Sequence, residues 1–220
     1  MKKNILFSIG LFLSVFSFAQ QINYGVSGGV SSYSIRGEAI GNFEQVISFT
    51  NGIVRTVPVT GFYFGGYANI PLGEKLSVEP GLYYSTKGYA MRGSFTFKGI
   101  SILGANAKAS LHSSYIEIPV QLKANFNGFQ VFAGPQIAYL SGARIKTSAG
   151  ILGFNLPTGS MNVTDQLNRW DAGIAGGIGY QFANGIRISG SYERGLSKID
   201  AGQNIKSYNQ GFKIGAGINL

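Results

Sequence analysis

The sequence contains few residues with which an enzyme could work. Its single histidine, His112, lies in the segment LHSSY next to Ser113 and Ser114. A hydrolase needs a nucleophile, a base and an orienting acid held together. Adjacent residues of a strand face opposite sides, so His112 and Ser114 form the pair that could act. No motif supplies the acid, and we therefore expect no catalytic residues and no enzymatic activity.

Metal and cofactor chemistry are not indicated either. The chain has no cysteine, one histidine and nine scattered acidic residues, so the usual ligand clusters are missing. The glycines of GEAIGN (37–42) and GLSKIDAGQN (195–204) have no phosphate-binding frame, because neither segment opens a helix. We expect no bound metal and no cofactor.

The charged residues are more informative, because they alternate with apolar ones. In YIEIPVQLKANF (115–126), every second residue from Ile116 to Phe126 is apolar, and Glu117, Gln121 and Lys123 lie between them. This alternation predicts a strand with one apolar and one polar face. The polar phase of the other strands includes Lys87 and Asp171. From this phase we predict an interior polar cluster formed by Glu79, Glu117, Lys123, Arg187, Glu193 and Lys213.

The same pattern recurs along the chain and predicts eight strands. The connections between them alternate in length: Leu72–Lys75, Asn127-Gly128 and Asn184-Gly185 are tight, whereas 36–58, 92–111 and 145–168 are long. Asn-Gly between alternating runs is a strong hairpin signal, since both residues tolerate positive φ. Residues 160–168 could add one helical turn, and the long connections could carry β extensions of their own, since 46–49 and 100–103 have sequences that could pair. The predicted strands are 22–35, 59–71, 76–91, 112–126, 129–144, 169–183, 186–198 and 207–219.

Eight strands with short and long connections in alternation predict an all-β fold, an eight-stranded antiparallel up-and-down transmembrane β-barrel. The alternative is a soluble barrel with the apolar phase inside. Its core would need about thirty large side chains, more than the lumen of eight strands holds. The apolar phase is therefore expected to face lipid. Pro80, Pro119 and Pro135 lie within predicted strands, where we expect bulges or irregular pairing.

The first residues, MKKNILFSIGLFLSVFSFAQ, have the features of a secretory signal peptide. Lys2 and Lys3 precede an apolar run, and Ser17-Phe18-Ala19 provides small residues at a cleavage site. A short transmembrane helix is the alternative, but the run is shorter than the roughly 20 residues a span needs. We expect residues 1–19 to be removed, leaving one domain, 20–220.

The charge of that domain points to a membrane rather than to nucleic acid. Without Lys2 and Lys3, the 18 basic residues become 16 against 9 acidic ones, a net charge of +7. The cations are dispersed, and an exported protein rarely meets nucleic acid. Anionic lipid headgroups are the expected counterpart. The end of the chain, with Lys213, Gly215, Ile218 and Leu220, is similar to a barrel-assembly signal, although Leu220 replaces the usual aromatic residue.

Two segments, YIEIPVQLK (115–123) and FQVFAGPQIAYL (129–140), carry a resemblance to a known family, as do WDAGIAGGIGYQF (170–182) and YERGLSKI (192–199). They resemble the outer membrane protein beta-barrel domain family of Bacteroidetes, often called PorT-like. The resemblance implies an outer-membrane protein that serves in envelope structure or in docking partners. An accessory role in secretion or gliding, or a narrow pore, are the alternatives. The implied partners are outer-membrane lipid and the barrel-assembly machinery, and we expect a monomer.

Overall fold

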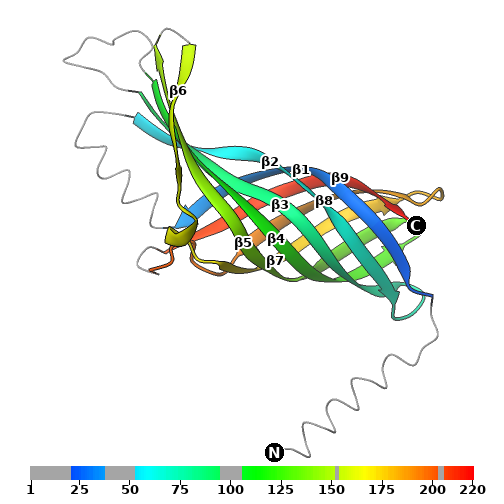
Figure 1. Ribbon diagram of the computed structural model, residues 1–220. Helices are drawn as coiled ribbons and strands as arrows, with labels where there is room; N and C mark the ends of the chain where they lie inside the picture. The colour runs from blue at the N-terminus through cyan, green and yellow to red at the C-terminus, as the bar shows by residue number, and fades with distance from the viewer. Residues whose placement is uncertain (1–20, 38–52, 95–105, 152–153, 203–205) are drawn as a thin grey trace, which may run out of the picture.

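The computed structural model describes residues 21–37, 53–94, 106–151, 154–202 and 206–220, nearly all of them in β-strands (Figure 1). The predicted signal peptide lies outside these residues. The described residues contain no helix that is long and apolar enough to span a membrane. The elements are β1 (Asn23–Gly37), β2 (Ile53–Pro71), β3 (Leu76–Ser94), β4 (Asn106–Phe126), β5 (Phe129–Ile151), β6 (Phe154–Asn162), the 3₁₀ turn η2 (Thr164–Gln166), β7 (Trp170–Gln181), β8 (Ile186–Gly195) and β9 (Ser207–Asn219).

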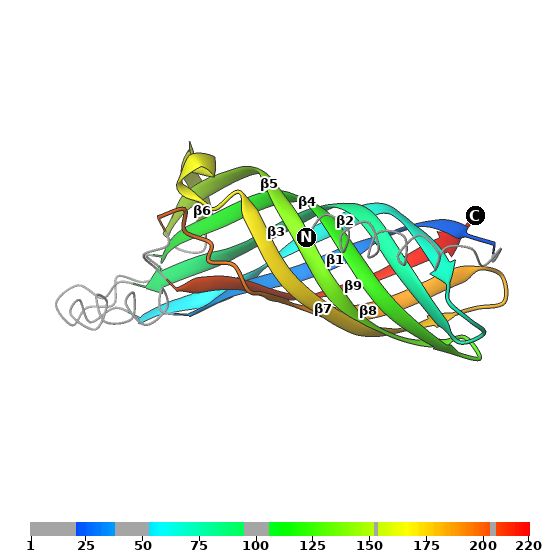
Figure 2. The ribbon, with the colours of Figure 1, turned by 90° about the horizontal axis from the view of Figure 1, so that it is seen from below.

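Eight of the strands close into a barrel, as predicted. Every pairing is antiparallel, and the order of strands in the sheet is β4-β3-β2-β1-β9-β8-β7-β5, with a further β4–β5 pairing that completes the ring. Figures 1 and 2 show the strands tilted around one axis. A closed ring leaves no unpaired edge along the wall, which is the requirement for crossing hydrocarbon with strands. The ninth strand, β6, pairs with β5 and lies outside the ring.

The tight turns gather at one end of the barrel, here called the turn end; the opposite end is the loop end. Asn127 and Gly128 have φ values of 52° and 93°, the positive values that a two-residue hairpin requires. Both ends of the described chain also lie here, because Leu220 N–H donates to the Tyr24 carbonyl at 2.8 Å. The alternation of short and long connections therefore separates the two ends of the molecule.

The two phases of each strand face as the sequence predicted. On β4, Ile118 and Leu122 are 52% and 54% exposed, whereas Glu117 and Lys123 are 1% exposed. The same inversion holds around the ring, where exposed large apolar side chains cover the outer wall. Aromatic pairs such as Tyr139 with Trp170 lie on that wall, with ring centroids 5.1 Å apart. The outer surface thus has the apolar and aromatic character of a lipid-facing band.

The prolines within strands interrupt the ladder of paired residues but do not shift the register of the strands. The β3–β4 ladder passes from Pro80↔Val120 to Tyr83↔Glu117 without a change of register. The β4–β5 ladder likewise passes from Pro119↔Gln136 to Leu122↔Ala133. The expected irregular pairing is present, but the bulges lie elsewhere, on β2–β3, on β4–β5 beside Ser114, and on β5–β6. Proline removes a donor here without adding a residue to the strand.

On one side of the barrel the strands continue past the ring at the loop end (Figure 1). This extension comprises residues 53–58 of β2, 88–94 of β3, 106–112 of β4, 144–151 of β5, and β6. Most of these residues were predicted to lie in the long connections, which could carry β extensions, and the structure shows such extensions; the two segments expected to pair, 46–49 and 100–103, lie outside the described residues. Their hydrogen bonds come from neighbouring strands, which no local pattern reveals. The single helical turn predicted within 160–168 is η2, at Thr164–Gln166.

Candidate functional site

The candidate site is the interior of the barrel, where the structure brings the predicted charged residues together. All six of the predicted residues are buried, and Lys87 and Asp171 are buried with them. Among the described residues, the buried charged side chains are therefore four acids and four bases, so their formal charges sum to zero. The acids are Glu79, Glu117, Asp171 and Glu193, and the bases are Lys87, Lys123, Arg187 and Lys213.

Three of these residues form a group near the turn end. Glu79 on β3 accepts from Arg187 on β8 through both carboxylate oxygens, at 2.9 Å and 2.8 Å. Lys123 on β4 donates to the same carboxylate. In the order of the ring, β8 lies opposite β3, so the Arg187–Glu79 pair spans the lumen. Two cations share one acid in this group, which leaves it with a formal excess of one positive charge.

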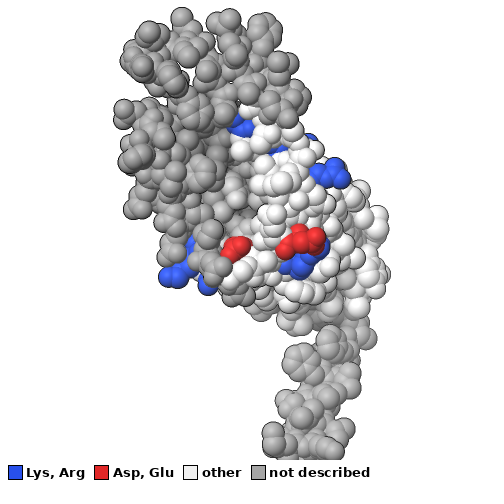
Figure 3. All heavy atoms as spheres, turned by 60° about the vertical axis from the view of Figure 1, so that its left-hand side comes forward, with Lys and Arg blue, Asp and Glu red and all other residues white. Residues whose placement is uncertain are grey.

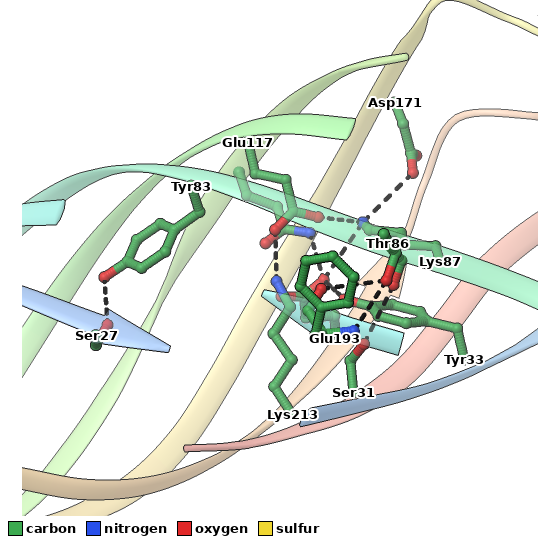
Figure 4. A network of polar contacts seen from close by, with 12 residues as sticks. Ser27, Ser31, Tyr33, Tyr83, Thr86, Lys87, Glu117, Asp171, Glu193 and Lys213 are labelled. Atoms are coloured by element: carbon green, nitrogen blue, oxygen red, sulfur yellow. Dashed lines mark hydrogen bonds and ion pairs between the residues drawn. The ribbon is translucent and has the colours of Figure 1, made fainter. Parts of the chain in front are cut away.

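Four residues nearer the middle form a closed cycle of alternating charge (Figure 4). Lys87 Nζ lies 2.8 Å from Glu117 Oε1, and Glu117 Oε2 lies 2.5 Å from Lys213 Nζ. Lys213 Nζ lies 2.5 Å from Glu193 Oε1, and Glu193 Oε2 lies 3.4 Å from Lys87 Nζ. Lys87 and Glu117 come from β3 and β4, whereas Glu193 and Lys213 come from β8 and β9 across the ring. The cycle therefore ties opposite walls together.

Neutral polar groups surround the cycle and satisfy part of its hydrogen-bonding capacity, although Glu117 Oε1 and Asp171 Oδ1 accept no hydrogen bond from the described residues. Tyr33 donates its hydroxyl proton to Glu193, and Gln136 Nε2 donates to the same carboxylate at 2.9 Å. Asp171, 3.9 Å from Lys87 Nζ, accepts from Asn209 Nδ2 at 2.8 Å. A buried carboxylate is tolerated only when it is paired and hydrogen-bonded. The eighth charge, Asp171, offsets the excess positive charge of the group at the turn end.

Aromatic rings line the space between the charges. Arg187 lies 4.2 Å from the centre of the Tyr67 ring, and Lys87 lies 5.0 Å from that of Tyr33. Lys213 is placed in the same way, 5.2 Å from the Tyr63 ring. Cations over ring faces at these distances gain electrostatic attraction, more so where water is excluded. The rings also fill volume, and the cavity that remains between the two charged groups is about 60 Å³.

An apolar cluster lies beyond the cycle toward the loop end. Along the inward face of β4, the order from turn end to loop end is Lys123, Glu117, Tyr115 and Leu111. Tyr115 and Leu111 pack with Ala138, Leu140, Ala143 and Val163. Val163 adjoins η2 and donates its N–H to the Ala143 carbonyl at 3.1 Å. The interior is therefore apolar at this end, where the chain after β6 covers the inner face with apolar side chains.

Among the residues that the structure describes, the surroundings of His112 do not assemble a catalytic set. His112 is exposed on the outer wall of β4, beyond the last apolar residue of that face, Ile116. Burial and the charges of Lys146 and Lys108 lower the pKa of its imidazole. Ser114 accepts a hydrogen bond from the Tyr84 hydroxyl at 2.9 Å. A base of this kind is normally oriented by an acid, and the charged groups that act on His112 are cations.

Sequence reasoning left several interior residues out of the cluster. Lys87 and Asp171 were predicted to point inward but were not among the six residues of the predicted cluster. They belong to the cluster because their charged partners lie on distant strands. The other omitted residues have the opposite parity to the exposed apolar residues of the same strand, and this alternation is the signal that could have found them. They are Tyr33, Tyr63, Tyr67, Tyr115, Gln136 and Asn209.

Comparisons with known proteins identify the family of the chain and several similar solved structures. The family described as "Outer membrane protein beta-barrel domain" matches residues 18–201. The attachment invasion locus protein Ail of Yersinia pestis is 15% identical, with a TM-score of 0.42 over 91% of this chain and 100% of that one. Neisserial surface protein A is 9% identical, with a TM-score of 0.46 over 91% and 100%. The outer membrane protease OmpT of Escherichia coli is 10% identical, with a TM-score of 0.44 over 92% and 98%. No curated protein matches the chain.

Proposed function

The chain belongs to the outer membrane protein beta-barrel domain family, and from that premise we propose that it is a non-enzymatic outer-membrane barrel with a closed interior. Its task in the envelope is structural or is performed by the loop end, which faces outward and meets ligands or partners. The turn end faces the periplasm, as in barrels with short turns on that side. The proposed partners are outer-membrane lipid and, during biogenesis, the assembly machinery; nucleic acid is not among them, and the protein is a monomer.

The closed cycle Lys87–Glu117–Lys213–Glu193 is the observation that carries this proposal. Its ion pairs of 2.5–3.4 Å reach from one wall to the other. An ion that moved through the lumen would have to break these pairs, and each break would leave a buried charge without its counterpart. The small cavity between the charged groups supports a closed barrel in preference to a pore.

Planar-bilayer recording of the purified protein tests the closed interior. The wild-type protein should insert without stable conductance steps. The quadruple variant Glu79→Ala/Arg187→Ala/Glu193→Ala/Lys213→Ala removes two acids and two bases together, takes away the pairs that cross the lumen in both charged groups and leaves the Lys87–Glu117 pair intact, so it should conduct. Stable steps from the wild-type protein, equal to those of the quadruple variant, would favour the narrow pore.

The absence of enzymatic activity is proposed from the surroundings of His112. Lys108 and Lys146 oppose the imidazolium that a general base forms during catalysis. The test is incubation of the inserted protein with phospholipid vesicles and with unstructured peptide. We expect no hydrolysis. Turnover that disappears in His112→Ala would establish an enzyme.

A role as an accessory component of secretion or gliding is the second candidate, and it rests on the PorT-like, Bacteroidetes-type segments 115–123 and 129–140. These segments form neighbouring strands of the ring and supply Glu117, Lys123 and Gln136 to the interior. Deletion of the gene followed by comparison of exported proteins tests this role. Unchanged export with intact envelope integrity would contradict it.

Export itself is proposed to use residues 1–19 as a cleaved signal peptide. Mass spectrometry of the protein extracted from the outer membrane should find Gln20 at the N-terminus. A mature protein that retains Lys2 and Lys3 would support the alternative, an uncleaved N-terminal helix. Fractionation in the same experiment reports the location independently of cleavage.

A further inference from the structure

Two of the tight turns at the turn end contain the same dipeptide, Asn-Gly. They are Asn127-Gly128, between β4 and β5, and Asn184-Gly185, between β7 and β8. Figure 3 shows charged side chains on the face toward the loop end, whereas residues 126–129 and 182–185 of these two turns include none. The two pairs therefore share their local chemistry and differ in backbone geometry.

An Asn-Gly pair can react with itself, because glycine has no Cβ to hinder the approach of its nitrogen to the asparagine side chain. The glycine nitrogen bonds to Cγ, the bond from Cγ to the side-chain nitrogen breaks, and ammonia leaves with the proton that the glycine nitrogen has lost. Water then opens the resulting succinimide ring. Opening at Cγ gives aspartate, and opening at the main-chain carbonyl carbon gives isoaspartate, whose main chain is longer by a methylene. The reaction needs water and no other reagent.

The turn at Asn127 holds the glycine nitrogen away from the asparagine side chain. Asn127 has a φ of 52°, in the left-handed region, where ψ is about +47°. At that ψ the nitrogen of Gly128 lies nearly opposite Cβ across the Cα–C bond. Ring closure needs a ψ of about −120°, and that value combined with a positive φ is the type II′ conformation that glycine adopts. The Gly128 N–H also donates to Asn125 Oδ1 at 2.9 Å, so the turn has to come apart before the attack.

The turn at Asn184 has a backbone that permits the reaction. Gly185 N–H donates to the Phe182 carbonyl at 3.0 Å, which makes Asn184 the third residue of a four-residue turn. Its φ is not positive, since Asn127 is the one non-glycine residue with a positive φ among those that the structure describes. At this position of a type I turn φ is about −90° and ψ about 0°. Rotation of ψ through the right-handed region, which is sterically allowed, brings the Gly185 nitrogen toward the side chain.

A hydrogen-bond donor that is already in place also activates the Asn184 side chain. Its Oδ1 accepts a hydrogen bond from the Ile186 N–H at 3.1 Å. When the Gly185 nitrogen attacks Cγ, negative charge develops on this oxygen, and a preorganised N–H donor stabilises that charge. None of the described residues donates to the Asn127 side chain. The turn at Asn184 therefore supplies a stabilisation that the described surroundings of Asn127 lack.

We infer that Asn184 is a site of spontaneous deamidation in the folded barrel, and that the turn at Asn127 protects the same dipeptide from this reaction. The modified turn adjoins the strand pair that closes the ring. The Gly185 carbonyl accepts from the Asn219 N–H at 3.1 Å, and Asn219 on β9 lies opposite Gly25 on β1. Isoaspartate lengthens the main chain between Asn184 and this carbonyl, so the contact with the end of β9 weakens as the protein ages.

Peptide mapping by mass spectrometry measures both sites in one sample. The protein, folded in detergent micelles, is incubated at neutral pH and digested, and the deamidated peptides of Asn184 and Asn127 are quantified over time. In the folded protein Asn184 should convert at least about tenfold faster than Asn127, because a single donor to a developing oxyanion can contribute more than that. In urea the two rates should become similar, since the dipeptide is the same. Heat-modifiable migration on gels reports that each folded sample is intact.

Variants of Asn125 test the protection of the other turn. Asn125→Ala frees the Gly128 N–H and should raise the conversion of Asn127 about fivefold, the equivalent of one net hydrogen bond, with the conversion of Asn184 unchanged. Asn125→Asp keeps an acceptor oxygen at this position and is the matched control, which should leave the conversion of Asn127 slow.

Hydrogen exchange of the Asn219 amide tests the consequence for the ring. Exchange should be faster in aged protein than in fresh protein, and Asn184→Ser should abolish the difference. Equal conversion of Asn184 and Asn127 in the folded protein would overturn the inference, because the turns would then not control the reaction. An intact Asn184 in folded protein, after the sample in urea has converted, would overturn it as well. Unchanged exchange of the Asn219 amide in fully converted protein would contradict the weakened contact.

Discussion

The lumen and the extension contain the same kinds of cation in opposite surroundings. Inside the ring, Lys87, Lys123, Arg187 and Lys213 each contact a carboxylate from another strand. In the extension, strands that are continuous with the ring carry five cations and no acid. The difference follows from depth. A charge at the level of the membrane cannot reach water or mobile ions, so the chain must supply its partner.

The comparison also shows how little stability an ion pair guarantees by itself. Desolvation of two buried charges can cost as much as their attraction returns. The interior pairs are better explained by the directions in which the side chains point. The outer wall faces lipid and must be apolar, so the polar residues point into the lumen and have to pair there. Their zero net charge is the arrangement that makes such a lumen tolerable.

Removal of one interior acid should have the largest effect. Glu117→Gln removes one of the two carboxylates that Lys87 and Lys213 share and leaves them only Glu193 in the cycle, and we expect a loss of about 3–5 kcal/mol in the free energy of unfolding. Urea unfolding followed by the fluorescence of Trp170, the single tryptophan, measures it. Glu117→Gln/Lys213→Met, which removes an opposite charge as well, should recover part of the loss. If both variants unfold at the wild-type midpoint, the interior pairs do not stabilise the barrel.

The facing of the wall is tested by a lysine on each side of β4. Ile118→Lys puts a charge on the lipid face, where Ile118 is 52% exposed, and should cost about 1–3 kcal/mol, since Ile118 lies between the membrane centre and the edge of the apolar band. Gln121→Lys, at a position that lines the interior cavity, should cost less. The yield of heat-modifiable protein in the outer membrane checks both. If the outer membrane contains equal amounts of the two variants, the assignment of the lipid-facing and lumen-facing sides of β4 is wrong.

Packing of the lumen is tested by adding a methyl group to a glycine on the inner side of the wall and, as a control, to one on the outer side. A Cβ at Gly215 would come within 3.0 Å of both the Tyr63 hydroxyl and the Gly28 carbonyl oxygen. Gly215→Ala should therefore destabilise the barrel by about 1–3 kcal/mol through overpacking. Gly190, whose Cβ would meet only the Lys213 carbonyl oxygen at 3.9 Å, is the matched control. Similar unfolding midpoints for the two alanine variants would indicate a loosely filled interior.

The smallest effect is expected at an exposed ion pair near the loop end. Asp165 and Arg169 lie 2.6 Å apart, but the Asp165 side chain is 93% exposed. Asp165→Asn should change the free energy of unfolding by about 0–1 kcal/mol. Urea titration at low and high salt measures the change. A loss comparable to that of Glu117→Gln would remove the distinction between paired charges inside and outside the ring.

Much of the fold was present in the sequence, because a barrel strand has a short and strict period. Alternation over 115–126 set the phase of β4, and the Asn-Gly pairs set the hairpins and with them the turn end. Closure of eight strands then required the apolar phase to face outward. The interior residues could be assigned to the lumen for the same reason, one strand at a time.

Which interior residue meets which was decided only by the tertiary structure. Glu117 and Glu193 are 76 positions apart, and they share Lys87 and Lys213 because the ring places β3 and β4 opposite β8 and β9. The same holds for the extension, where residues predicted to lie in the long connections form strands because neighbouring strands supply hydrogen bonds. Local alternation determines the direction of a side chain, but register and closure across distant strands determine its partner.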